Sequence, residues 1–197
     1  LSRPVSRYLM EENIRKGREY IYARDYQKAL NVFNDIIKTY PAEPEGYYNL
    51  GLLYLYTGEQ DKSVKAMEKA VKYDKNNPVY MTGLGKAYME KGNIPSAIDN
   101  LKKAIKINKN ICDSYLYLGE AYYKNGNKSE AITNFNYCVN NFPETDSANI
   151  ANNWLERLSK TGNNISELPE EPDKYGNEKN NNNYTPGELS KYLKEKN

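Results

Sequence analysis

Apolar residues along most of the chain recur at helical spacing, in short segments separated by turns. From Leu50 through Tyr54 they follow the i, i+3, i+4, i+7 spacing of an amphipathic helix. Gly58 stands where that helix would end, because glycine adopts a left-handed backbone at a helix C-terminus without a steric penalty. A second helical pattern follows over residues 63–70. The local pattern therefore predicts an antiparallel pair of helices.

The same pair returns with a period of 34 residues. One column of the repeat is glycine, at Gly17, Gly51, Gly85 and Gly119. Large apolar residues form a second column, at Phe33, Met67, Leu101 and Phe135, and small residues a third, at Ala29, Ser63, Ala97 and Ala131. A fixed period between 20 and 50 residues indicates stacked supersecondary units. We predict four units, at 10–43, 44–77, 78–111 and 112–145.

The glycine column lies in the middle of the first helix of each unit. Glycine in a helix interior costs roughly 1 kcal/mol relative to alanine, so four equivalent glycines need a structural reason. We expect them to allow close approach of the second helix, with the small-residue column as the facing side chain.

This pattern closely resembles the tetratricopeptide repeat family, including the repeat-end prolines Pro41 and Pro143. Lys75 and Lys109 depart from the family by replacing that proline in the two middle units. The resemblance implies an all-α fold, an α-solenoid of about four helix pairs. In similar proteins the first helices of successive repeats line a concave groove that binds an extended or helical peptide.

The groove columns of the family carry tyrosine, aliphatic and charged residues here, and we expect them to stay open to solvent. The candidate groove residues are Arg18, Tyr22, Tyr48, Asn49, Leu52, Tyr56, Thr82, Lys86, Met89, Tyr117, Glu120 and Tyr123. Aromatic anchors among mixed charges are typical of a protein interface. The alternative is that some of these side chains only pack between neighbouring repeats.

One subclass of the family clamps the carboxylate end of a chaperone with lysine, asparagine and arginine side chains. The corresponding positions here are Ile14, Arg18, Asn49, Val79 and Gly83. Only Asn49 matches, with Arg18 a partial substitute in charge. The sequence therefore does not indicate a carboxylate-clamp co-chaperone and favours an apolar or aromatic peptide.

Three segments flank the repeats. Residues 1–9 are predicted to be an irregular lead-in, and residues 146–160 to be a helix that caps the last repeat, as stacked arrays require. Trp154 is interpreted as a packing anchor of this cap, with an exposed ligand contact as the alternative. Residues 161–197 are low in complexity and predict a flexible tail with a short helix at 186–195. We also hypothesise that this tail competes for the groove.

Composition excludes several kinds of chemistry. A net charge of +2 argues against an electrostatically driven nucleic-acid binder, and no apolar run is long enough to span a membrane. The chain has no histidine, which removes the commonest general base and metal ligand. We therefore predict no catalytic residues, no metal site and no cofactor.

The two cysteines lack the CxxC spacing of a zinc or redox site. Cys138 lies in an apolar column and is interpreted as a buried hydrophobic residue. A disulfide is the alternative, because Cys112 and Cys138 fall at the start of the first helix and the end of the second helix of one repeat.

Two functions remain open. The favoured one is a non-catalytic adaptor that binds a protein or peptide partner in the tyrosine-rich groove. The alternative is a structural subunit of a larger assembly that uses its end faces or convex side, with self-association through the end repeats or the tail. The segment 141–151 looks like the repeats of periplasmic assembly proteins, which favours the bacterial envelope over the cytoplasm. The chain begins at Leu1, so we expect an upstream segment, where a signal sequence or lipid anchor would support that location.

Overall fold

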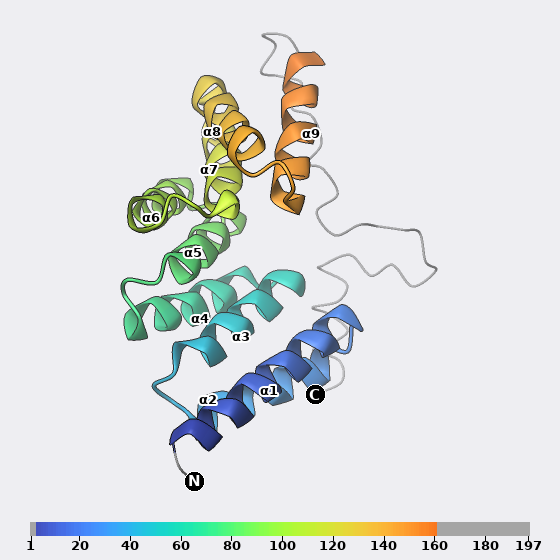
Figure 1. Ribbon diagram of the computed structural model, residues 1–197, viewed down its shortest axis with the longest axis vertical. Helices are drawn as coiled ribbons and strands as arrows, with labels where there is room; N and C mark the ends of the chain where they lie inside the picture. The colour runs from blue at the N-terminus through green and yellow to red at the C-terminus, as the bar shows by residue number, and fades with distance from the viewer. Residues whose placement is uncertain (1–2, 161–197) are drawn as a thin grey trace.

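The computed structural model describes residues 3–160, which form nine α-helices without a strand among them. They are α1 (Arg3–Tyr22), α2 (Tyr26–Thr39), α3 (Pro44–Tyr56), α4 (Gln60–Tyr73), α5 (Pro78–Glu90), α6 (Ile94–Ile107), α7 (Cys112–Lys124), α8 (Lys128–Asn141) and α9 (Asp146–Lys160). Consecutive helices pack against one another as pairs, and the first helices α1, α3, α5 and α7 also contact each other in succession. The pairs stack into a curved array, with α9 beside α7 and α8 (Figure 1). The protein is an all-α solenoid.

Left-handed residues end the first helix of every pair. Gly58, Gly92 and Gly126 have φ angles of 73°, 86° and 81°, as their sequence positions predict. The equivalent residue of the first repeat is Arg24, which takes φ 59° although it carries a side chain. Because the left-handed conformation costs an ordinary L-residue roughly 1–2 kcal/mol, the first repeat contains local strain that the other three avoid.

The N-terminal segment differs from the prediction. Helix α1 begins at Arg3, so most of the expected irregular lead-in 1–9 is helical. Arg7 pairs with Glu11 one turn later, and its guanidinium also reaches Glu45 at the start of α3. Tyr40, which follows α2, donates a hydrogen bond to the Ser6 carbonyl at 3.2 Å. These contacts hold the start of α1 against the α2–α3 turn.

The helix crossings depend on the glycine column, but the facing residue is not the small one that we expected. A Cβ on Gly85 would lie 2.6 Å from Cγ of Leu101, and one on Gly119 would lie 2.5 Å from the Phe135 ring. The large apolar column therefore fills the notch above each glycine. The small column contacts the backbone instead: Ser63 donates a hydrogen bond to the Gly51 carbonyl at 2.9 Å.

Helix α9 covers the apolar face of the last repeat. Trp154 is buried, stacks on Phe135 with 5.7 Å between ring centroids, and donates a hydrogen bond from Nε1 to Glu120 at 3.1 Å. Trp154 is thus a packing anchor, and the alternative of an exposed ligand contact is wrong.

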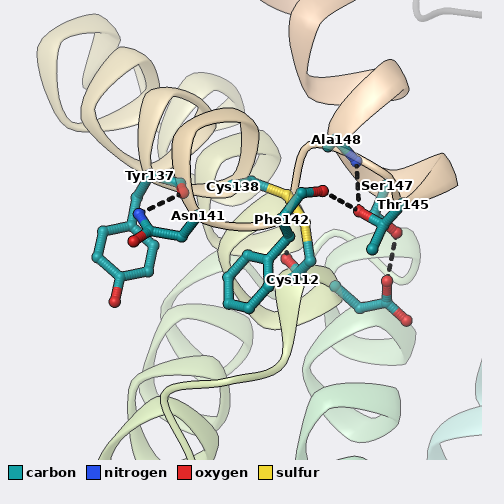
Figure 2. Close-up of a disulfide and its surroundings, with 9 residues drawn as sticks. Cys112, Tyr137, Cys138, Asn141, Phe142, Thr145, Ser147 and Ala148 are labelled. Atoms are coloured by element: carbon teal, nitrogen blue, oxygen red, sulfur yellow. Dashed lines mark hydrogen bonds between the residues drawn. A yellow bond between two sulfur atoms is a disulfide. The ribbon is translucent and has the colours of Figure 1, made fainter.

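A disulfide closes the fourth repeat. Cys138 is buried as predicted, but its sulfur is bonded to Cys112, so the less favoured alternative is the correct one. The antiparallel packing of α7 and α8 places the two Cα atoms 5.2 Å apart, within the range that a disulfide spans. Figure 2 shows the bond beside Phe142 and the turn that leads into α9.

The expectations for the C-terminal segment concern residues that the structure does not describe. The flexible tail 161–197 and its short helix at 186–195 lie outside the described residues. Among the helices of residues 3–160, none is both long and apolar enough to span a bilayer.

Candidate functional site

The first helices of repeats two to four enclose a pocket of about 210 Å³. Most of its wall is apolar or aromatic, with one lysine and one aspartate. The lining residues are Tyr48, Leu52, Leu55, Tyr56, Val79, Thr82, Gly83, Lys86, Ile111, Asp113 and Tyr117. They come from α3, α5, and α7 with its N-cap, so the pocket exists only because three repeats stack side by side.

Tyr48 forms a rigid part of this wall. Its ring lies at 5.0 Å from the ring of Tyr80, and a Cβ on Gly83 would lie 2.7 Å from its Cε2 atom. Burial raises the pKa of Tyr48 to about 12, helped by the nearby Tyr117 and Asp113. The glycine at position 83 thus gives the tyrosine of the preceding repeat room to lie flat against α5.

Lys86, the one lysine of the pocket, contacts the tyrosine that α7 contributes. Lys86 donates a hydrogen bond to the Tyr117 hydroxyl at 3.1 Å, and its ammonium lies 4.6 Å from the centroid of the same ring. A cation over an aromatic face is attracted by the ring quadrupole. Lys86 therefore has a defined position rather than a solvated, mobile one.

Sequence and structure comparisons place this geometry in a family. Family models described as tetratricopeptide repeat match residues 14–79 and 113–145, and one described as TPR repeat matches residues 85–126. Together they cover most of the helix pairs. The chain belongs to the tetratricopeptide repeat (TPR) family. No curated protein matches the chain in sequence.

Solved TPR structures share the fold of this chain. A thermophilic TPR protein of Thermus thermophilus is 21% identical, with a TM-score of 0.68 over 77% of this chain and 82% of that chain. MamA of Desulfovibrio magneticus is 20% identical, with a TM-score of 0.60 over 70% and 77%. The first TPR of Spaghetti (RPAP3), solved with an HSP90 peptide, is 21% identical, with a TM-score of 0.55 over 60% and 92%.

The twelve groove candidates predicted from sequence lie in three kinds of place: the pocket, a second hollow on α1, and positions packed inside the array. Six of the twelve candidates line the pocket: Tyr48, Leu52, Tyr56, Thr82, Lys86 and Tyr117. Tyr56 is the most open of these tyrosines, with 37% of its surface exposed. Arg18 and Tyr22 lie further along on α1, where they line a wider hollow of about 370 Å³, and Tyr22 is 81% exposed.

The expectation of an open surface is wrong for four candidates, which are buried: Asn49, Thr82, Met89 and Glu120. Thr82 shares a 2.6 Å hydrogen bond with Ser114 of the next repeat, although it also borders the pocket. Met89 packs in the core formed with α6 and α7. Glu120 accepts the Trp154 hydrogen bond beneath α9. Thr82 and Met89 thus contact the repeat that follows, and Glu120 contacts the cap.

The side chain of Asn49, the one match to the carboxylate clamp, forms its hydrogen bonds with other residues of the repeat array. Its side-chain amide donates to the Glu45 carbonyl at 2.7 Å, and its Oδ1 accepts from Nε of Arg18 at 2.8 Å. Tyr123 is likewise occupied, since its ring packs against Trp154 at 5.0 Å. For these residues the alternative of packing between neighbouring elements applies.

The pocket also contains residues that were not among the twelve groove candidates, although Val79 and Gly83 had been considered as positions of the carboxylate clamp. Val79, Ile111 and Asp113 lie at the starts of α5 and α7, and Gly83 lies under Tyr48. Val79 and Asp113 are one repeat apart, so the 34-residue period could have indicated them as a further groove column. Within residues 3–160, no three histidine, cysteine, aspartate or glutamate side chains group as a metal ion would require.

Proposed function

We propose that this protein is a non-catalytic adaptor that binds a peptide segment of a partner protein in the pocket between α3, α5 and α7. The observation that carries the proposal is the pocket itself: a hollow of about 210 Å³ walled by tyrosine and aliphatic side chains across three TPR repeats. Interfaces of this composition, with aromatic anchors around a small number of charges, are typical of protein recognition.

The ligand class follows from the wall. Leu52, Leu55 and Tyr56 offer apolar surface on one side, and Val79 and Ile111 offer it on the other. Lys86 and Asp113 are charges of opposite sign, so the pocket does not select a strongly acidic or basic chain. The best fit is a segment that inserts one aromatic or large aliphatic side chain. The peptide bound by the RPAP3 TPR supports a short peptide as the kind of ligand that this fold accepts.

Tyr56 is the residue with which to test the proposal. It lines the pocket and is 37% exposed, so its truncation removes contact surface without opening the core. Tyr48 and Tyr123 are unsuitable, because their rings pack against Tyr80 and Trp154. Tyr8→Ala is the matched control, since Tyr8 is 67% exposed on α1 and lines neither hollow.

The experiment selects peptides from a random displayed library on the wild-type protein and measures their affinity by fluorescence polarisation. We expect enrichment of peptides with an aromatic or large aliphatic residue. Tyr56→Ala should weaken them about 30-fold, because a buried aromatic anchor commonly contributes roughly 2 kcal/mol or more. Tyr8→Ala should bind as wild type does. Peptides that bind Tyr56→Ala as tightly as wild type would refute the pocket and favour the end faces or convex side of an assembly subunit.

A further inference from the structure

The last two residues of α4 and α6, with the first two residues of the turns that follow, carry the same four-residue pattern, one repeat apart. It reads Lys-Tyr-Asp-Lys at 72–75 and Lys-Ile-Asn-Lys at 106–109. The last lysine of each stands where the first and fourth repeats have Pro41 and Pro143. The pattern is therefore confined to the two central repeats, where it replaces a residue that would only rigidify the turn. We call residues 72–75 and 106–109 the lysine edge.

The charge of the lysine edge is not neutralised by its neighbours. All four lysines are exposed, and within residues 3–160 none of them forms an ion pair. The one acid is Asp74, whose carboxylate accepts hydrogen bonds from the backbone of Asn76 and the amide of Asn77. The two segments together carry a net charge of +3.

Exposed apolar side chains accompany these lysines. Tyr73 is 46% exposed and Ile107 is 45% exposed, at equivalent positions of the two repeats. Tyr73 stacks on Tyr47 with 5.5 Å between ring centroids, which fixes the ring at the surface. The chain turns from α4 into α5 at one side of the array, away from α9 (Figure 1). Each segment of the lysine edge thus presents one exposed apolar side chain between two lysines.

We propose that the lysine edge binds the surface of a bilayer that contains anionic phospholipids. The lysines are single positive charges on long stems, spread over two repeats, and none of them lines either hollow. That arrangement suits a mobile layer of phosphate and carboxylate headgroups more than one acidic side chain at a fixed place. Tyrosine is enriched at membrane–water interfaces, and basic residues near an anionic leaflet strengthen binding by about 5-fold each.

The test is sedimentation of the full chain with vesicles of phosphatidylcholine, with and without phosphatidylserine. Two four-residue variants lose the same charge. The edge variant carries Lys72→Gln, Lys75→Gln, Lys106→Gln and Lys109→Gln, and the control variant carries Lys16→Gln, Lys62→Gln, Lys65→Gln and Lys102→Gln. Far-ultraviolet circular dichroism establishes that both are folded. A third variant, Tyr73→Ser with Ile107→Ser, tests the apolar contribution at constant charge.

Wild type should bind only the vesicles with phosphatidylserine, and binding should fall as salt is added, because salt screens exposed charges. The edge variant should partition about 600-fold more weakly, because it loses four lysines that each contribute about 5-fold. The control variant should lose clearly less, and the serine variant should lose binding at unchanged salt dependence. Equal losses in both lysine variants, or equal binding to both kinds of vesicle, would overturn the proposal. So would binding to polyglutamate without binding to vesicles, which would indicate an acidic protein partner. The edge variant should still bind pocket peptides, so failure here leaves the adaptor function standing.

Discussion

The disulfide offers the sharpest test of how the fourth repeat is held together. Cys112 and Cys138 are separated by 26 residues, and that loop contains nearly all of α7 and α8. In the chain-entropy view, cross-linking a loop of this length destabilises the unfolded state by about 3.5 kcal/mol at 25 °C. Reduction should lower the free energy of unfolding by an amount of that order.

Urea unfolding followed by tryptophan fluorescence measures this loss. Trp154 is the one tryptophan of the chain and is buried against Phe135 of the cross-linked pair, so it reports on this region. With an m-value of about 2 kcal/mol per molar urea, the midpoint should fall by roughly 1.5–2 M on adding a thiol reductant.

The double variant Cys112→Ala with Cys138→Ala is the control, because its midpoint should not respond to reductant. Equal midpoints for oxidised and reduced wild type would refute the reasoning: either the bond does not form or α7 and α8 are already as restricted without it. A functional consequence follows as well. Cys112 lies between the pocket residues Ile111 and Asp113, so reduction should also weaken peptide binding, whereas a purely distant cross-link would leave it unchanged.

Three further predictions concern the helix crossings, the turns and pH. Gly85→Leu should lower the free energy of unfolding by roughly 1–3 kcal/mol in thermal unfolding, because the new leucine side chain would overlap Leu101. Lys65→Ala, at an exposed position, is the control. A Gly85→Leu protein that melts as wild type does would contradict the tight crossing. Arg24→Gly should raise the free energy of unfolding by about 1 kcal/mol, because glycine adopts the left-handed conformation without strain. Lys16→Gly, in the interior of α1, is the control and should lower it. A lower free energy of unfolding for Arg24→Gly would show that no strain is stored at position 24. The pKa of four tyrosines is raised to about 12. Burial is the main cause at Tyr48, Tyr80 and Tyr115. At Tyr88 the main cause is a hydrogen bond to Glu68. A raised pKa means that the folded state holds the phenol proton more tightly, so this stability is complete below pH 10 and is lost as pH rises from 10 through about 12. Tyrosinate absorbance in the native protein should lag behind that of the urea-unfolded chain, and coincident titrations would contradict it.

The sequence by itself determined the repeat architecture, because the signals that define it are local. Helical spacing of apolar residues and the turn glycines at positions 58, 92 and 126 act within one unit, and the 34-residue period repeats that unit along the chain. A helix pair cannot bury its apolar face alone, so the period also implies stacking and a terminal cap. The fold class and the role of α9 could therefore be predicted without a structure.

Only the tertiary structure decided which groove columns stay open. Asn49 and Glu120 occupy columns equivalent to exposed or pocket-lining residues, yet one is buried beside Arg18 and the other beneath Trp154. Burial depends on the neighbouring repeat, and the neighbours differ in side-chain size even where the columns agree. The bond between Cys112 and Cys138 likewise depends on tertiary packing, because the positions of the two cysteines in the sequence do not determine the distance between α7 and α8. The pocket, too, exists only where side chains of three consecutive repeats meet, which is a property of their packing and not of any one unit.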